Sequence, residues 1–178
     1  MTASNRNRST SAVLLAEYAQ IKDEQRARIG FRDNLLYVTL AAVTAVAAVA
    51  VQSDNLQLIL ALPVVCLVLG WTHLVNDEKI SAIGRYVRTD LASRLAETIG
   101  VEDPLFGWEA YHRSDAKRSS RKITQTIIEL VTFLVTPFAA LIVFWCHSTG
   151  NTLLVSVSIL ETAGLVILGV LFLQYAER

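Results

Sequence analysis

The sequence predicts an all-α, polytopic membrane protein: four transmembrane helices in two hairpins, a helical cytosolic segment between the hairpins, and an N-terminal amphipathic helix. Hydrophobic residues make up 53% of the 178 residues, against about 45–50% in ordinary soluble domains. They gather in four stretches without Lys or Arg: residues 34–51, 56–75, 123–147 and 152–175. A bilayer core about 30 Å thick requires about 20 apolar residues of helix, and helices satisfy the backbone where water is absent.

Residues 1–33 are predicted to form a cytosolic amphipathic helix. Apolar residues recur there at helical spacing: Leu14, Tyr18, Ile21 and Ile29. Glu24 and Arg28 form an i,i+4 ion pair in the favourable order, and Gly30 is expected to end or bend the helix before the first span. The apolar face packs against the protein's own cytosolic segment, which we favour, or it lies on the membrane or contacts another subunit.

Two short polar connections predict how the spans are paired. Residues 52–55 join the first two spans and residues 148–151 join the last two, so each pair is expected to form a hairpin. The hairpins then cover residues 34–75 and 123–175. The polar segment between them, residues 76–122, is predicted to be helical and cytosolic.

The distribution of Lys and Arg predicts the orientation. Of the 16 such residues, six precede the first span, nine lie in segment 76–122, one is Arg178, and the short connections have none. Because basic residues stay on the cytoplasmic side, both termini, including residues 176–178, and the central segment are expected inside, in the inner or plasma membrane. The first 33 residues lack the apolar core of a signal peptide, so the first span is expected to remain as an anchor.

The central segment is predicted to contain two helices. An apolar stripe follows the second span: Ile80, Ile83, Val87, Leu91 and Leu95. No strong helix-breaking signal precedes this stripe, so the second span is expected to run on into the cytosol, and Gly100 ends the helix. Asp103 and Pro104 then begin a second helix. Three aromatic residues follow as a small core or as interfacial anchors: Phe106, Trp108 and Tyr111.

Basic residues gather immediately before the third span: Arg113, Lys117, Arg118, Arg121 and Lys122. Their expected partner is a lipid bilayer with anionic headgroups, where each basic residue contributes about 1 kcal/mol. A nucleic-acid partner is not expected, because the portions predicted to be cytosolic carry 13 acidic residues against 16 basic ones and show no nucleic-acid-binding motif.

The sequence offers no pattern for catalysis, for a metal or for a cofactor. Cys66 and Cys146 are expected at depths that differ by about half a bilayer, so we do not expect a disulfide between them. His73, His112 and His147 are expected at three different levels, and no metal-ligand spacing occurs. A phosphate-binding glycine motif and a Ser, His and acid set at one depth are also absent. We therefore expect no catalytic residue.

Glu161 is the most unusual residue of the predicted spans. It lies nine residues from the outer end of the fourth span, about 13 Å deep, where an acid costs about 2.5 kcal/mol or more and normally faces the bundle interior. Counting depths across the last hairpin places Thr136 and Pro137 level with it. Because Pro137 has no N–H, the carbonyl of Phe133 lacks its helical partner. A protonated Glu161 is expected to donate to that carbonyl or to Thr136.

Glu129 is the second acid in a predicted span. It lies about 9 Å from the inner end of the third span and close to the basic run. We therefore interpret it as a boundary residue that Arg121, Lys122 or the inner interface satisfies.

The run VNDEKISAIGRYVR, followed by FGWE and the basic stretch, resembles a group of small bacterial integral membrane proteins with four helices. The general layout is also similar to membrane effectors of bacterial defence systems, in which a cytosolic sensor triggers membrane disruption. The resemblance brings no catalytic residue. It implies a candidate interaction surface that comprises Asn76, Asp77, Arg85, Tyr86, Trp108 and Glu109. These side chains are alternatively satisfied within a pair of cytosolic helices, which we favour.

Two classes of function agree with these patterns. The first is a non-enzymatic, membrane-anchored interaction or effector module that self-associates or binds a cytosolic protein. The second is a small channel, or a proton- or cation-coupled carrier, that uses Glu161. Carriers commonly contain internal repeats with broken helices at matching positions. Because Pro63 and Pro137 are not at equivalent positions of the two hairpins, we favour the first class.

Overall fold

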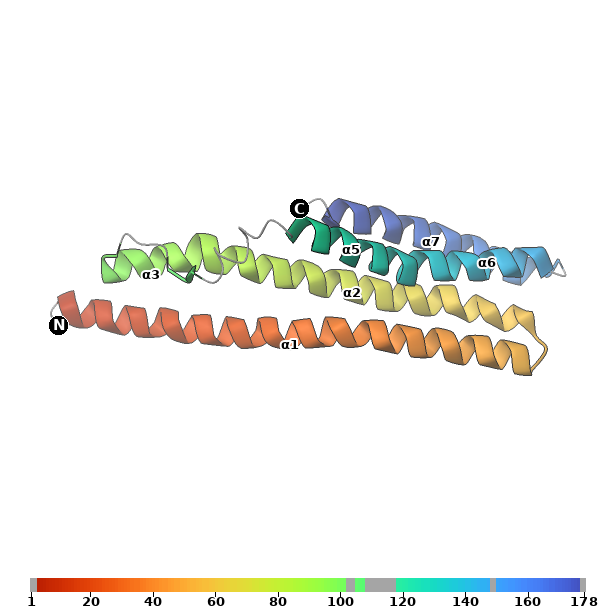
Figure 1. Cartoon of the computed structure of the whole chain (residues 1–178), viewed down its shortest axis with the longest axis horizontal. Helices are drawn as coiled ribbons and strands as arrows, with labels where there is room; N and C mark the ends of the chain where they lie inside the picture. Colours follow the sequence, from red (N-terminus) through yellow and green to blue (C-terminus); the bar gives the residue numbers. More distant parts are fainter. Residues whose placement is uncertain (1–2, 102–104, 108–117, 148–149, 177–178) are drawn as a thin grey trace. The chain divides into compact units, whose positions relative to one another are not determined.

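The computed structural model describes residues 3–101, 105–107, 118–147 and 150–176. Every secondary-structure element in these residues is a helix, which confirms the all-α fold (Figure 1). The elements are α1 (Ala3–Gln52), the 3₁₀ helix η1 (Leu56–Leu60), α2 (Ala61–Tyr86), the π-helical turn η2 (Val87–Leu91), α3 (Ala92–Ile99), α5 (Arg118–Leu130), the π-helical turn η3 (Val131–Val135), α6 (Thr136–His147) and α7 (Thr152–Ala176).

Four helical runs are long and apolar enough to cross a membrane. They are Asn5–Gln52, Leu56–Ile99, Ser120–His147 and Thr152–Tyr175. Each run contains one of the four apolar stretches, so the prediction of four long apolar helices is confirmed. The run that begins at Leu56 passes through α2 into α3, as expected for a second span that continues beyond the apolar stretch.

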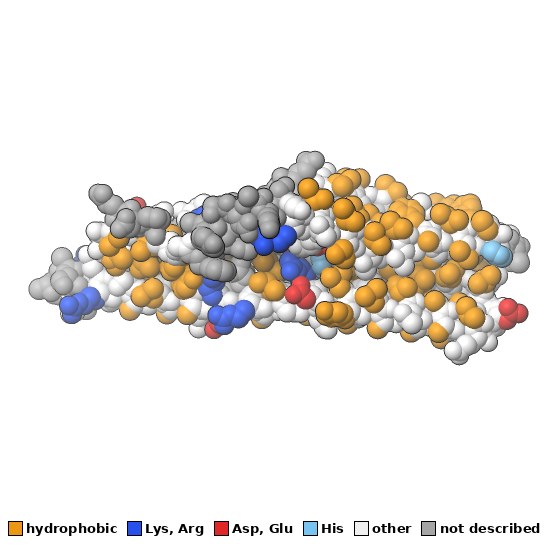
Figure 2. Space-filling model, in the orientation of Figure 1, with side chains coloured by type: hydrophobic (Ala, Val, Ile, Leu, Met, Phe, Trp, Pro, Cys, Tyr) orange, Lys and Arg blue, Asp and Glu red, His pale blue; other side chains and the backbone are white. Residues whose placement is uncertain are grey.

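The chain forms two compact units. Residues 1–31 and 76–119 make up the first, which we call the polar unit, and residues 32–75 and 120–178 make up the second, the apolar unit. Figure 2 shows hydrophobic side chains over much of the visible face of the apolar unit. Charged side chains are concentrated in the polar unit and near the beginning of the apolar stretches.

Helix α1 corrects one expectation about the N-terminal segment. Gly30 does not end the helix, which continues without interruption to Gln52. A glycine ends a helix efficiently when it takes the left-handed conformation, as Gly100 does with φ 70° after α3. Gly30 remains in the right-handed helix, where a single glycine costs only about 1 kcal/mol relative to alanine. The predicted end at Gly100 is confirmed.

The polar unit has a hydrophobic core of its own. Its buried residues come from both predicted stripes: Leu14, Val87, Leu91 and Leu95. Tyr18 packs beside them and stacks on Phe106, with ring centroids 4.2 Å apart and planes inclined by 7°. The N-terminal helix therefore packs against the protein's own central segment, which confirms the interpretation that we favoured for its apolar face.

The apolar unit is closely packed where α2, η3 and α7 meet. A Cβ atom on Gly70 would lie 2.9 Å from Cδ2 of Leu168 and 3.1 Å from Cδ1 of Phe133. Phe133 and Leu168 are themselves buried in one cluster with Leu74 and Phe172. Glycine at position 70 allows the backbone of α2 to approach the side chains of the other two elements.

A π-helical turn precedes Pro137 and changes the hydrogen bonds expected there. In η3 the N–H of Thr136 donates to the carbonyl of Val131, five residues earlier. In that register position 137 would donate to the carbonyl of Thr132, but proline has no N–H. The thiol of Cys66 on α2 donates to this Thr132 carbonyl, at 4.0 Å. A side chain of a neighbouring helix thus occupies the position of the missing backbone donor.

Candidate functional site

Glu161 lies on the buried face of α7. The buried side chains of this helix recur at helical spacing: Ser158, Glu161, Leu165, Leu168 and Phe172. Glu161 is 5% exposed, which confirms that it faces the interior of the helix packing. Apolar side chains occupy the next three positions of the stripe.

The carboxylate of Glu161 has no hydrogen bond within the described part of the chain. Both of its oxygens are buried without a partner, so the expected bond to Thr136 or to the Phe133 carbonyl is not present. Thr136 instead donates to the carbonyl of Val131 at 3.0 Å. The hydroxyls near Glu161 on α7 also bond within their own helix, from Ser158 to Val155 O and from Thr162 to Ser158 O.

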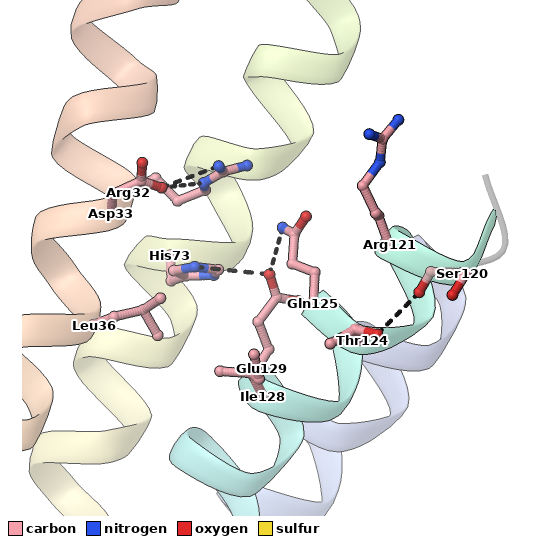
Figure 3. Close-up of a pocket in the computed structure, with 10 residues that line it drawn as sticks. All are labelled: Arg32, Asp33, Leu36, His73, Ser120, Arg121, Thr124, Gln125, Ile128 and Glu129. Carbon is pink, nitrogen blue, oxygen red and sulfur yellow. Dashed lines mark hydrogen bonds and ion pairs between the residues drawn. The ribbon is translucent and has the colours of Figure 1, made fainter. Parts of the chain in front are cut away.

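A second group of polar residues surrounds a pocket of about 350 Å³ in the apolar unit (Figure 3). Helix α1 contributes Arg32, Asp33 and Leu36, and α2 contributes His73. The remaining lining residues belong to α5: Ser120, Arg121, Thr124, Gln125, Ile128 and Glu129. The sequence did not predict this pocket.

His73 and Glu129 are the buried pair of the pocket. His73 Nε2 lies 3.8 Å from Glu129 Oε1, and the two side chains are 1% and 9% exposed. Gln125, one turn earlier on α5, donates to the same oxygen at 2.7 Å. The His73 ring also packs against Phe133, with centroids 5.1 Å apart. Glu129 is therefore buried and held by His73 and Gln125, partners that the boundary interpretation did not include.

The other polar side chains carry charges of both signs around this pair. Arg32 and Asp33 form an ion pair at 3.0 Å, and the Asp33 side chain is 54% exposed. Arg121 is exposed at the beginning of α5. Figure 3 shows Arg32 and Asp33 on one side of the His73–Glu129 pair and Arg121 on the other. The pocket thus combines two guanidinium groups with two carboxylates.

Two of the candidate interaction residues make contacts within the polar unit. The Tyr86 hydroxyl donates to Glu17 Oε1 at 2.6 Å, and this hydrogen bond raises the pKa of Tyr86 above its ordinary value of 10. Asn76 is buried and accepts from Arg28 Nη1 at 3.3 Å. Both contacts join α1 to α2, in agreement with the interpretation that these side chains are satisfied between helices.

The remaining candidates differ in exposure. Arg85 is exposed and Asp77 is half-buried. In the basic run, Arg121 is exposed and Lys122 is half-buried, both in the first turns of α5. Several predicted residues lie outside the described residues: Trp108, Glu109, Arg113, Lys117, and the side chain of Arg118.

Cys66 is buried and Cys146 is exposed, and both are free thiols. Among the residues that the structure describes, no group of three or more His, Cys, Asp or Glu side chains is placed to hold a metal ion. His112 lies outside those residues.

No protein-family model, curated protein or solved structure matches the chain. The resemblance of residues 75–109 to small bacterial membrane proteins therefore stays a prediction.

Proposed function

We propose that this protein is a multi-pass membrane protein whose polar unit acts on the cytoplasmic side as an interaction or effector module. The exposed surface of the apolar unit carries the membrane part of this proposal. Large hydrophobic side chains there are more than half exposed on α1, α2, α6 and α7, for example Leu40, Val68, Ile142 and Leu160. Soluble proteins rarely expose such wide apolar surfaces, whereas lipid tails solvate them favourably.

The polar unit supports the interaction part of the proposal. It contains its own core and cross-helix hydrogen bonds, and its two helical segments continue directly from the apolar stretches of α1 and α2. Charged residues cover its surface, including Arg85 and Arg94, which are exposed. A folded, charged unit joined to four apolar helices is the arrangement of a membrane-anchored binding module.

The orientation follows from the basic residues. Because Lys and Arg flank the apolar stretches on one side only, both termini and the polar unit are placed in the cytoplasm. The two hairpins then put the connections at residues 52–55 and 148–151 on the opposite side of the membrane.

Site-directed labelling in whole cells tests the proposed topology. In a Cys146→Ser background, Ser53→Cys is expected to react with a membrane-impermeant thiol reagent, and Ser93→Cys is expected to react only after the cells are opened. Cys66 is buried and serves as an internal negative control. Labelling of Ser93→Cys in intact cells with protection of Ser53→Cys reverses the orientation, and recovery of the protein in the soluble fraction refutes the membrane proposal.

A search for partners tests the interaction part. The full chain, extracted in mild detergent, is expected to retain a cytosolic protein or a second copy, and Arg85→Glu combined with Arg94→Glu is expected to reduce that retention. Lys122→Glu, outside the polar unit, is the control for added negative charge. If the double variant and Lys122→Glu retain the partner equally, the polar unit is not the binding surface.

One observation favours the alternative function, a small channel or a proton- or cation-coupled carrier. Glu161 is buried, and neither carboxylate oxygen is hydrogen-bonded within the described residues. Intramembrane acids of this kind commonly exchange protons or bind cations. Purified protein in liposomes distinguishes the two functions: if the wild-type protein conducts protons or monovalent cations and Glu161→Gln does not, the carrier or channel replaces the interaction module. Glu97→Gln, at an exposed position of the polar unit, is the control.

A further inference from the structure

We propose that the pocket around His73 and Glu129 binds the headgroup of a phospholipid that carries phosphoethanolamine. The inference rests on the membrane topology of the proposed function, because that topology determines the level of the bilayer at which the pocket lies. Arg32 lies just before the first apolar stretch, His73 near the end of the second, and Arg121 just before the third. In the proposed topology these three positions meet at the cytoplasmic boundary of the bilayer, where phospholipid headgroups lie.

The charges of the pocket match a headgroup with both signs. Arg32 and Arg121 supply two positive charges, and Asp33 and Glu129 supply two negative charges. A headgroup with negative charge only would lie close to these carboxylates, and the repulsion between like charges would weaken its binding. Phosphoethanolamine carries one phosphate and one ammonium group, so it can place each group beside side chains of the opposite sign.

The phosphate is assigned to the beginning of α5. The Arg121 guanidinium presents several N–H donors in a plane, which suits phosphate oxygens. Ser120 and Thr124 line the same wall of the pocket, one helical turn apart. The Thr124 hydroxyl donates to the Ser120 carbonyl at 3.0 Å, so the hydroxyl assigned to a phosphate oxygen is that of Ser120. Figure 3 shows Arg121, Ser120 and Thr124 grouped on this helix.

The ammonium group is assigned to two carboxylates of the lining, Asp33 on α1 and Glu129 one to two turns further along α5. The Asp33 side chain is 54% exposed, and Arg32 donates to its Oδ1, so Oδ2 is the oxygen assigned to the ammonium group. Glu129 lies deeper, between His73 and Gln125. A primary ammonium donates three hydrogen bonds to such acceptors. A trimethylated ammonium, as in phosphocholine, has no N–H and cannot make them.

The size and the apolar lining of the pocket agree with a lipid rather than a soluble ion. Its volume of about 350 Å³ is at the lower end of the range of small-molecule sites, about 300–1,000 Å³. Leu36 and Ile128 also line it, and Ile128 is 50% exposed. These side chains provide apolar contacts for the glycerol and the first acyl carbons of the same molecule.

Lipid retention by the purified full chain tests the inference. The protein is reconstituted in nanodiscs that contain equal amounts of phosphatidylethanolamine, phosphatidylcholine and phosphatidylglycerol, extracted in mild detergent, and analysed by native mass spectrometry. We expect phosphatidylethanolamine to be retained several-fold more than either of the other two lipids. Equal retention of the three, or preference for phosphatidylglycerol, overturns the inference.

Two variants at exposed positions change the retention in different directions. Arg121→Gln is expected to lower the retention of phosphatidylethanolamine several-fold, whereas Lys122→Gln, next to it but outside the pocket lining, leaves it unchanged. Asp33→Asn is expected to shift the preference toward phosphatidylglycerol, because it removes a negative charge and leaves two guanidinium groups. Equal losses in Arg121→Gln and Lys122→Gln would indicate attraction by surface charge alone and refute the site.

The outcomes also separate this inference from the proposed function. A protein that is found in the membrane with the proposed orientation but shows no lipid preference refutes the inference alone. A soluble protein, or one with reversed orientation, refutes the proposed topology. If water-soluble glycerophosphoethanolamine displaces the retained lipid at equal concentration, the ligand is a soluble headgroup and the lipid assignment is wrong.

Discussion

Glu161 combines burial with the absence of a hydrogen bond on its carboxylate in the described residues. In the proposed bilayer an uncharged side chain is the least costly group at this position. Glu161→Gln is therefore expected to keep the fold and to change the free energy of unfolding by less than about 1 kcal/mol, because glutamine has the same shape without a charge. Glu161→Lys is expected to lower the free energy of unfolding by at least about 2.5 kcal/mol. Thermal unfolding in detergent, followed by circular dichroism, measures both effects.

The control for Glu161→Lys is the same substitution, glutamate to lysine, at an exposed position. Glu97 is exposed on α3, and Glu97→Lys is expected to change the free energy of unfolding by no more than about 0.5 kcal/mol. If Glu161→Lys unfolds no earlier than Glu97→Lys, residue 161 does not face the interior.

The hydrogen bond from Tyr86 to Glu17 gives a second prediction for a single residue. Tyr86→Phe is expected to lower the free energy of unfolding by about 1 kcal/mol, because it removes the 2.6 Å bond between α1 and α2. Since folding raises the pKa of Tyr86, this stabilisation is complete below the ordinary pKa of 10 and is lost as the pH rises through the higher folded-state value.

Thermal unfolding of the two proteins at neutral pH and above pH 10 provides the measurement. The stability difference between wild type and Tyr86→Phe should shrink at the alkaline pH. Tyr37→Phe is the matched control, because the Tyr37 side chain is 71% exposed, and it should match the wild type at both pH values. A constant difference for Tyr86→Phe would contradict the assignment.

Individual residues also mark the limit of prediction from sequence. The inward direction of Glu161 could be predicted, because the cost of an acid among lipid depends only on depth and chemistry. The pair of His73 and Glu129 could not, although both were expected near the inner edge. Whether two side chains at one depth meet depends on the rotation of each helix about its axis. That rotation is set by packing, including the close approach at Gly70.

At the scale of helices, substitution by alanine is expected to have opposite effects on the free energy of unfolding at Gly70 and at Gly30. Gly70→Ala is expected to lower the free energy of unfolding by about 1–3 kcal/mol, because the new Cβ would lie 2.9 Å from Leu168 and 3.1 Å from Phe133. Gly30→Ala is expected to raise it by up to about 1 kcal/mol, since nothing lies within 4 Å of a Cβ there. Thermal midpoints of the two variants measure both changes. Shifts of the same sign would contradict the packing at Gly70.

The helices themselves were predicted well, and their irregularities were not. Apolar length and the left-handed Gly100 could be recognised from residue types, because these signals are local. The continuation of α1 through Gly30 and the π-helical turns η2 and η3 could not be recognised from residue types in this way. The turn before Pro137 is an example. The sequence showed that Pro137 lacks an N–H, but it did not show that the hydrogen bonds there join residues five apart. The carbonyl without a backbone donor is therefore that of Thr132 and not that of Phe133.

At the scale of the whole molecule, α1 provides the prediction of self-association. Its apolar window is the least buried of the four, and it exposes small residues one to two turns apart: Ala41, Ala45 and Ala48. Small residues let helices approach closely in membranes. Ala45→Cys in a Cys146→Ser background is therefore expected to form a disulfide-linked dimer in native membranes under mild oxidation.

A cysteine at another exposed apolar position provides the comparison. Val166 on α7 is 54% exposed, and Val166→Cys is expected to cross-link several-fold less than Ala45→Cys. The readout is the dimer fraction on a non-reducing gel. Equal cross-linking at the two positions would indicate random collisions and contradict an α1 interface.

The overall architecture illustrates which large-scale features a sequence determines. Four long apolar helices follow from hydrophobic stretches alone and are present in the structure. The pairing of the spans into hairpins and their orientation in a bilayer stay predictions, because they depend on a lipid environment. The core of the polar unit was predictable in outline, since two amphipathic stripes in one chain bury each other most simply.

The contact of Cys66 with the Thr132 carbonyl has a kinetic consequence. A thiol reagent can reach this buried sulfur only when α2 separates from η3, so the alkylation rate of Cys66 reports how often the two elements part. Cys146 is exposed in the same chain and gives the rate of an unprotected thiol under the same conditions. The ratio of the two alkylation rates therefore measures the local opening between α2 and η3 with natural cysteines alone, and no cysteine has to be introduced.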